Sequence, residues 1–239
     1  MVAIEVADLR VCYGSYEAVK GVSFALAKGE ILGIVGESGS GKSTIAKTLM
    51  GLERAASGTI SFPSGPVRLQ MIFQDAVGSL NPRMTIRQTL REVIAQIQGR
   101  RGDAAEAEAR RLLGLVGLSE AVLDQYPREM SGGQCQRVSI ARALATQPEI
   151  LIADEPVSAL DVSVQARVLN LLRELRQKMG LTILLIAHDL AVVKNVCDRI
   201  CVMERGRFVD VGDTEQVFAH PTSDYTKNLL SAVPTLDAV

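Results

Sequence analysis

Residues 36–43 constrain the fold of this chain more than any other segment. Their sequence, GESGSGKS, matches the pattern G-x-x-x-x-G-K-[ST], in which glycines let backbone N–H groups curl around a phosphate. The apolar run 31–35 before them predicts a buried strand, and residues 42–51 predict a helix. A phosphate would therefore lie at a helix N-terminus, where the helix dipole favours negative charge. Lys42 can reach the terminal phosphates, and the Ser43 hydroxyl can bind magnesium.

Strands and helices alternate along most of the chain. This order predicts an α/β fold with a mostly parallel sheet and right-handed crossovers, which binds its ligands at the carboxyl ends of the strands. Alternating or short apolar runs predict further strands at 3–11, 22–27, 59–62, 67–73, 150–153, 182–187, 199–203 and 208–211. Helical patterns occupy residues 164–178 and a tail at 214–231.

The segment 85–147 differs from the rest because its pattern is helical throughout. Leu90, Val93, Ile94 and Ile97 recur at helical spacing, and no convincing strand interrupts them. We interpret the segment as a helical subdomain inserted into the α/β core. The chain is then a single domain, residues 1–239, whose core consists of residues 1–84 and 148–239.

Two carboxylates follow the apolar strand 150–153. Asp154 is placed to hold magnesium, directly or through water, as the acidic residue after such a strand does in phosphate-loop enzymes. Glu155 is the next residue and should point elsewhere, where it could polarise an attacking water as a general base. A solvated strand end would explain the pair equally well in isolation. The phosphate-loop motif in the same chain favours the catalytic interpretation.

Two more polar residues end predicted strands. Gln74 follows the strand 67–73 and could contact magnesium or water, and so respond to the terminal phosphate. His188 follows the strand 182–187. A single Gln or His is more often structural than functional, so only the position at a strand end makes these two candidates.

The segment Ser131-Gly132-Gly133-Gln134 predicts a second anion site. A Ser cap and two glycines expose backbone N–H groups at the start of a predicted helix. The segment belongs to the helical subdomain, too far away in our interpretation to serve the same phosphate. A dimer in which it closes over the partner's nucleotide is the simplest explanation. An ordinary helix cap is the alternative.

Charge and hydropathy bear on location and partners. The formal net charge of −1 argues against a nucleic-acid binder, which usually has a basic excess. No apolar run reaches the ~18 residues that span a bilayer, and the N-terminus does not resemble a signal peptide. We therefore expect a cytosolic chain that reaches a membrane through a partner. Cys197 and Cys201 could pair around a metal, but small apolar residues are the better interpretation.

Taken together and in this order, these segments resemble the ATP-binding cassette (ABC) family over nearly the whole chain. The resemblance implies a phosphate-loop NTPase fold of the RecA-like type: a mostly parallel α/β core with antiparallel N-terminal strands and an inserted helical subdomain. ATP and Mg²⁺ are the implied cofactors. The one small departure is Met130, where the family usually has Leu before the SGGQ signature; the two are similar in volume.

The same resemblance implies roles for individual residues. Tyr13 is similar to the aromatic that stacks on adenine, and Asp161 belongs to the segment called the D-loop. Lys42, Gln74, Glu155 and His188 correspond to the family's catalytic residues. The implied magnesium ligands are Ser43, Gln74 and Asp154. The implied nucleotide contacts are Tyr13, Gly36, Glu37, Ser38, Gly39, Ser40, Gly41, Lys42, Ser43, Thr44, Ser131, Gly132, Gly133, Gln134 and Asp161.

Three segments, residues 73–86, 154–166 and 220–234, are similar to the oligopeptide, dipeptide and nickel importers. This narrower resemblance implies uptake of peptides, nickel or metal chelates such as metallophores. It also implies a head-to-tail dimer with a second ATPase subunit that is a paralogue, together with two permeases and, indirectly, an extracellular solute-binding protein. The chain would then lie on the cytoplasmic face of the membrane. A soluble ABC ATPase acting on nucleic acid or ribosomes is the alternative, but no coiled-coil insertion, duplicated cassette or basic patch supports it.

Overall fold

The computed structural model describes residues 1–63 and 65–231, and their contacts divide the chain into two units. The first unit consists of residues 1–66 together with the chain from residue 182 onward. The second unit consists of residues 67–181. None of the helices described in either unit is both long and apolar enough to cross a bilayer.

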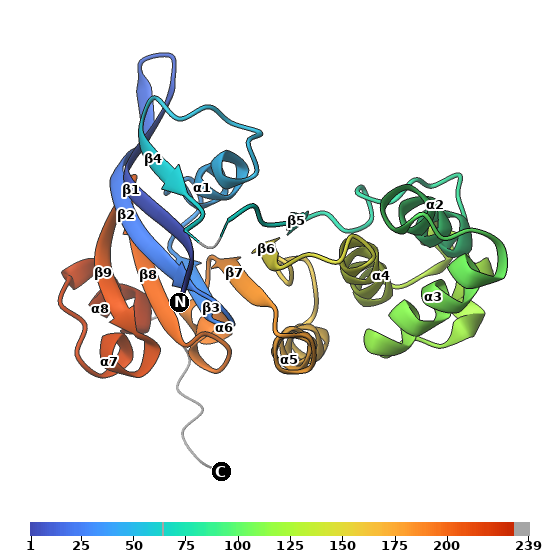
Figure 1. The fold of residues 1–239 in the computed structure, drawn as a ribbon. Coiled ribbons are helices and arrows are strands. Elements are labelled where there is room, and N and C mark those ends of the chain that lie inside the picture. The colour runs from blue at the N-terminus through green and yellow to red at the C-terminus, as the bar shows by residue number, and fades with distance from the viewer. Residues whose placement is uncertain (64, 232–239) are drawn as a thin grey trace, which may run out of the picture. The chain divides into compact units, whose positions relative to one another are not determined.

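A three-stranded antiparallel sheet opens the first unit, with the order β2-β1-β4. Its strands are β1 (Val2–Tyr13), β2 (Tyr16–Ala27) and β4 (Ser57–Ser61), and β1 and β2 form the long hairpin in Figure 1. One face is apolar: Ile4, Val6, Leu9 and Val11 are buried, and most of their neighbours are at least partly exposed. The period of two holds on either side of a register shift between Val6 and Leu9. The predicted antiparallel N-terminal strands are confirmed, although β2 begins at Tyr16 rather than at residue 22.

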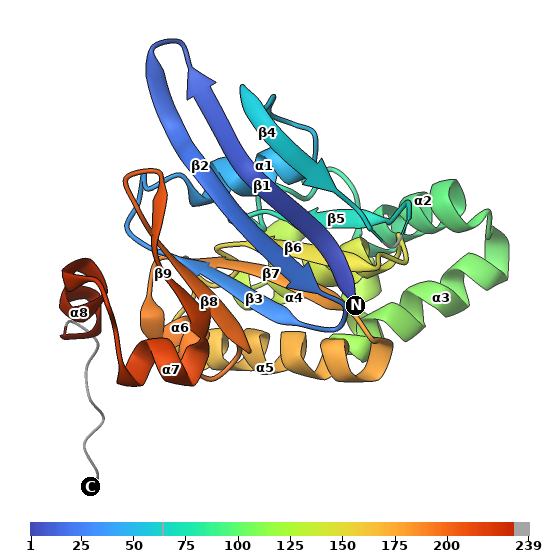
Figure 2. The same ribbon diagram turned by 60° about the vertical axis from the view of Figure 1, so that its left-hand side comes forward.

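The second sheet of the first unit is mixed. Strand β3 (Ile31–Val35) lies between β7 (Thr182–Ala187) and β8 (Arg199–Glu204) and is parallel to both, and β9 (Arg207–Asp213) pairs antiparallel with β8 (Figure 2). Every residue of β3 and β7 is buried. Continuous burial explains why these strands appear in the sequence as unbroken apolar runs.

Four helices accompany these strands: α1 (Lys42–Leu49), α6 (Leu190–Lys194), α7 (Thr214–Ala219) and α8 (Asp224–Ser231). Helix α6 had no predicted bounds, because five residues are too few to show a helical period. The predicted tail helix 214–231 is two helices in the structure. Pro221 follows α7 and lacks the N–H that would continue it. The tail segment 220–234 is described only as far as Ser231.

The second unit contains the predicted helical block. Parallel strands β5 (Leu69–Ile72) and β6 (Ile150–Asp154) precede and follow it in the chain. The block consists of α2 (Ile86–Gln98), α3 (Gly102–Leu115), the 3₁₀ turns η1 (Glu120–Asp124) and η2 (Pro127–Glu129), and α4 (Gly132–Leu144). Helix α5 (Val162–Met179) follows β6. The predicted α/β fold with a helical insertion is confirmed; the subdomain boundaries at 85 and 147 stay a prediction.

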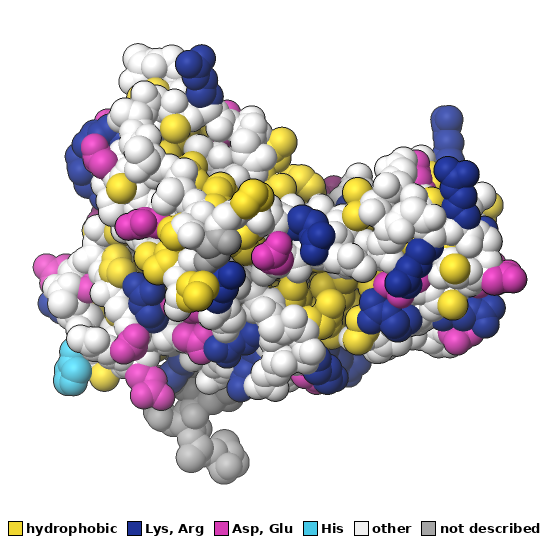
Figure 3. Space-filling model, in the orientation of Figure 1, with side chains coloured by type: hydrophobic (Ala, Val, Ile, Leu, Met, Phe, Trp, Pro, Cys, Tyr) yellow, Lys and Arg dark blue, Asp and Glu magenta, His cyan; other side chains and the backbone are white. Residues whose placement is uncertain are grey.

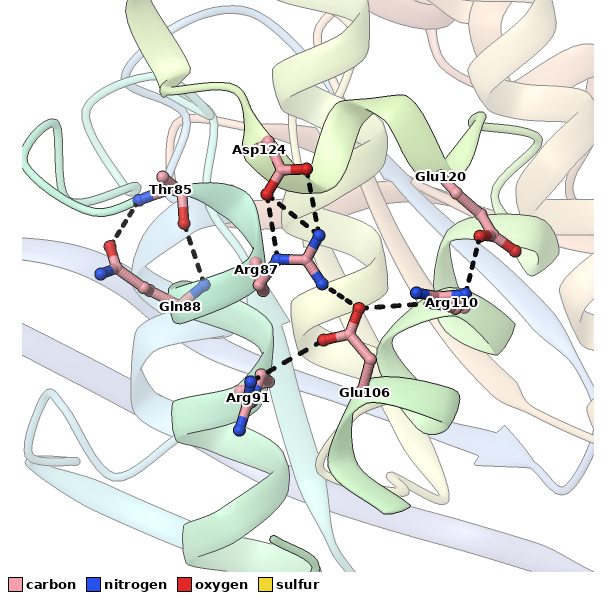
Figure 4. A network of polar contacts seen from close by, with 8 residues as sticks. All are labelled: Thr85, Arg87, Gln88, Arg91, Glu106, Arg110, Glu120 and Asp124. Carbon is pink, nitrogen blue, oxygen red and sulfur yellow. Dashed lines mark hydrogen bonds and ion pairs between the residues drawn. The ribbon is translucent and has the colours of Figure 1, made fainter. Parts of the chain in front are cut away.

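Ion pairs join α2, α3 and η1 within this block. Arg87 of α2 bonds Glu106 of α3 and both carboxylate oxygens of Asp124 in η1, and Arg110 joins Glu106 to Glu120 (Figure 4). The hydrogen bond from Arg87 is the main reason that the pKa of Glu106 lies below its usual range. Acidic and basic side chains intermingle over this surface (Figure 3). We infer that the cluster holds two helices and a turn together.

Candidate functional site

The phosphate-loop motif lies between β3 and α1 in the first unit. Gly36 and Gly41 are required by close backbone approach, whereas a Cβ on Gly39 would meet nothing within 4 Å. A Cβ on Gly36 would collide with the carbonyl oxygen of Met203, and one on Gly41 would lie 2.5 Å from the carbonyl oxygen of Ala18. Gly41 also has a φ of 111°, which side chains rarely tolerate. The loop is therefore seated against β2 and β8 in a way that only glycine allows.

The N-terminus of α1 is suited to an anion. Its N-cap residue, Gly41, has no side chain to accept a hydrogen bond, and the first turn contains no acidic residue. The first N–H groups of a helix have no partner inside the helix, so they can bind a phosphate. The Ser40 hydroxyl is buried and has no hydrogen-bond partner among the described residues, which leaves it another polar group for a ligand.

Lys42 supplies the positive charge of this loop. Its side chain is only 3% exposed, and its ammonium donates to the carbonyl oxygens of Gly36 and Glu37 at 2.7 and 2.8 Å. Both acceptors belong to the loop, so the ammonium is held where phosphates would bind. Ser43 is the next residue and is half-buried. An open helix end, a buried ammonium and an orphaned hydroxyl together fit the triphosphate that the sequence predicts.

The carboxylate pair lies at the end of β6 in the second unit. Asp154 is the last strand residue and is 7% exposed. Glu155 has a φ of 45°, a left-handed conformation that costs a non-glycine residue about 1–3 kcal/mol. Backbone strain of this kind often marks a functional site, and here it turns the chain sharply after the strand.

The structure brings Gln74 to Glu155. Strand β5 pairs with β6 in a register that sets Ile72 opposite Ala153, so both chains leave the sheet at the same edge. The Gln74 amide nitrogen then donates to the Glu155 carboxylate at 3.4 Å, a long hydrogen bond. The two residues were predicted separately from the ends of two strands, and parallel pairing makes them neighbours.

The SGGQ segment begins α4. The Ser131 hydroxyl accepts from the Gln134 N–H at 3.3 Å, and the Gln134 side chain accepts from the Ser131 N–H at 2.9 Å. This capping box satisfies the N–H groups of both Ser131 and Gln134 and fixes the start of the helix. Gly132 and Gly133 lie between these two residues, and neither has a side chain that could cover its own backbone N–H. The predicted cap is therefore present, with Gly132 exposed and Gly133 buried.

Gly133 and Gly132 offer a matched test of this segment. A Cβ on Gly133 would collide with Cγ1 of Val164 on α5, whereas one on Gly132 would make an ordinary 3.5 Å contact with Leu160. We expect Gly133→Ala to lower the free energy of unfolding by about 1–3 kcal/mol through overpacking and Gly132→Ala to change it little. Thermal unfolding of the two variants measures the difference. Equal melting temperatures would contradict the packing argument.

The remaining predicted residues lie in the two units as follows. In the first unit, Tyr13 ends β1 and is 45% exposed, and His188 follows β7 directly and is exposed. In the second unit, Asp161 caps α5 by accepting from the Val164 N–H at 3.0 Å, and its pKa is lowered mainly by a hydrogen bond from Ser163. Asp161 thus has a structural role besides the predicted nucleotide contact.

One contact with the phosphate loop was missed by sequence reasoning. The backbone N–H of Glu37 donates to the hydroxyl of Tyr225 in α8 at 2.9 Å. Nothing in the spacing around Tyr225 indicates that the tail returns to the loop. Cys197 and Cys201 are buried, and burial raises the pKa of the Cys201 thiol to about 12.

Comparison with known proteins agrees with this geometry. A family model described as "ABC transporter" matches residues 19–158. The oligopeptide transport ATP-binding protein OppF of Lactococcus lactis subsp. lactis is 46% identical over 233 residues, covering 92% of this chain and 73% of the relative. The chain belongs to the ABC transporter family. It is an ATPase that energises transport.

Solved ABC proteins share the fold. CbiO1 from Clostridium perfringens, part of the ABC transporter complex CbiONQ, has a TM-score of 0.82 and 28% identity; the match covers 92% of this chain and 91% of CbiO1. The cassette MJ0796, in a dimeric post-hydrolysis state bound to ADP and Pi, has a TM-score of 0.78 and 27% identity, covering 88% and 98% of the two chains. These likenesses agree with the α/β fold and helical insertion described above.

Proposed function

We propose that this chain binds and hydrolyses ATP with Mg²⁺ to power the import of peptides through partner permeases. The observation that carries the assignment of ATP is the phosphate loop. It combines the start of α1, which has no side-chain cap, with the buried ammonium of Lys42, which donates to a loop carbonyl. The peptide cargo is supported by the relatives, one named an oligopeptide transport protein and another a putative peptide import protein.

The residues have distinct parts in this proposal. Lys42 and the N–H groups of the loop bind the phosphates, and Tyr13 stacks on the adenine. Ser43, Gln74 and Asp154 would hold Mg²⁺, which supplies neutralising charge to the phosphates. Glu155 accepts the proton of the attacking water, and Gln74, already bonded to Glu155, orients that carboxylate. His188 contacts the terminal phosphate.

A second ATPase subunit completes the proposed cycle. The SGGQ segment is a second helix N-terminus with glycine N–H groups, and we assign it to the nucleotide of the partner subunit. ATP that binds both the phosphate loop of one subunit and the SGGQ segment of the other would close a head-to-tail dimer. Hydrolysis would remove the contact that favours the closed dimer, so the dimer would open. The dimeric MJ0796 structure supports such pairing. The two permeases would receive this closing and opening of the dimer at the cytoplasmic face of the membrane. The extracellular solute-binding protein would be affected only indirectly, through the permeases.

Uptake by the reconstituted transporter tests the cargo. We expect a radiolabelled oligopeptide, presented with the solute-binding protein, to stimulate ATP hydrolysis and to accumulate in proteoliposomes. Nickel and a nickel chelate serve as the comparison substrates. Accumulation of nickel without peptide would overturn the assignment of peptides, and stimulation by RNA without any uptake would favour the soluble alternative.

A further inference from the structure

Two hydrogen bonds hold one peptide group of the phosphate loop, one at each end. The Gly36 carbonyl oxygen accepts from the Lys42 ammonium at 2.7 Å. The Glu37 N–H, in the same peptide group, donates to the Tyr225 hydroxyl at 2.9 Å. Tyr225 belongs to α8, so the C-terminal part of the first unit contacts the group that holds the Lys42 side chain.

The start of α8 is anchored firmly enough to fix Tyr225. Asp210 of β9 is buried, and its carboxylate accepts from the N–H groups of Thr222 and Ser223, both at 3.0 Å. The hydroxyls of Thr222 and Thr226 also donate to it, and Thr226 is fully buried. Burial alone would raise the pKa of Asp210, but these hydrogen bonds hold it well below its usual range. A charged anchor therefore fastens both sides of Tyr225 to β9 at neutral pH.

The side chain of Tyr225 stands beside an open space. It borders a cavity of about 450 Å³ that is also lined by Tyr16, Lys20, Arg205 and loop residues 37–40. Burial, with the nearby charges of Glu37 and Glu204, raises the pKa of Tyr225, so the hydroxyl stays protonated at neutral pH. Loss of this hydroxyl alone would leave the ring in place and free the Glu37 N–H.

We propose that Tyr225 is a positioning residue for the phosphate loop, which acts on nucleotide affinity through the peptide group shared with Lys42. A bonded N–H polarises its peptide and makes the carbonyl oxygen a better acceptor. The Gly36 oxygen then holds the ammonium more firmly in the position where it meets the phosphates. This inference rests on the proposed role of Lys42 in binding ATP.

The variant Tyr225→Phe tests the inference, with Tyr16→Phe as the matched control from the same cavity. In Tyr225→Phe we expect faster hydrogen exchange at the Glu37 amide and a KM for ATP raised about fivefold, the size of effect that one hydrogen bond allows. The kcat and the melting temperature should stay within error of the parent. Tyr16→Phe should change none of these, and Asp210→Asn, which loosens the anchor, should raise KM in the same direction.

Two results would overturn the inference. One is that Tyr225→Phe leaves both the hydrogen exchange at the Glu37 amide and the KM for ATP unchanged. The other is that kcat and the melting temperature both fall, which would show that the substitution destabilises the whole fold. The exchange measurement needs no ATP. It therefore tests this inference by itself. A failure of the proposed function would appear in a different measurement, as normal ATP binding by the Lys42→Ala variant.

Discussion

Replacing Glu155 with Gln should leave ATP binding intact and slow hydrolysis by about 100-fold or more, since general-base catalysis contributes 10²–10⁴-fold. The amide has nearly the shape of the carboxylate and can keep a contact with Gln74, but it cannot accept a proton. The backbone strain at φ 45° is the same for either side chain, so the fold should not change. The measurements are nucleotide affinity and steady-state phosphate release.

Glu149→Gln is a suitable control for this variant. Glu149 precedes β6, at the end of the strand opposite to Glu155, and its side chain is exposed. The same chemical change there should leave turnover unaltered. We also expect Glu155→Gln to accumulate an ATP-bound dimer, visible by light scattering, because closure persists when hydrolysis is blocked. Normal turnover in Glu155→Gln would exclude Glu155 as the general base.

Replacing Lys42 with Ala should weaken ATP binding by roughly 100-fold and stop cargo uptake. A charge-assisted hydrogen bond contributes about 1.5–3 kcal/mol, and each 1.4 kcal/mol is a tenfold change in affinity. The ammonium is buried and held by two loop carbonyls, so solvent cannot replace it readily. Titration with a fluorescent ATP analogue and peptide uptake measure the two effects.

Lys47→Ala provides the matched control on the same helix. Lys47 lies in the last turn of α1 and is exposed, so its removal should change neither affinity nor uptake. Because removal of a buried Lys could also disturb the loop, circular dichroism and the melting temperature should accompany the assay. A folded Lys42→Ala protein that binds ATP normally would refute the role that we assign to the loop.

Much of the fold was predictable because its signals are local. Strands β3 and β7 are fully buried, so their apolar runs marked their bounds, and the structure begins and ends both as predicted. The helical block was recognisable from its period. The misses have equally physical causes: α6 is too short to show a period, and the break between α7 and α8 depends on Pro221.

The candidate residues could also be predicted from local patterns, whereas the contacts between them could not. The loop glycines, the Ser131 cap and the acidic strand end each have a local pattern that exists before the chain folds. The hydrogen bond between Gln74 and Glu155 follows only from the pairing of β5 with β6. The clash that forbids a side chain at Gly133 depends on α5, which begins almost thirty residues later.

The amino-acid sequence by itself determined the kind of chemistry, because phosphate binding needs glycines, a lysine and a helix start within one short segment. The tertiary structure alone decided which distant groups support that segment. Tyr225 lies 188 residues from Glu37 in the chain, and the buried carboxylate of Asp210 fastens the start of its helix, α8, to β9. A contact between residues so far apart depends on packing and on satisfying buried polar groups, and neither leaves a local pattern in the sequence.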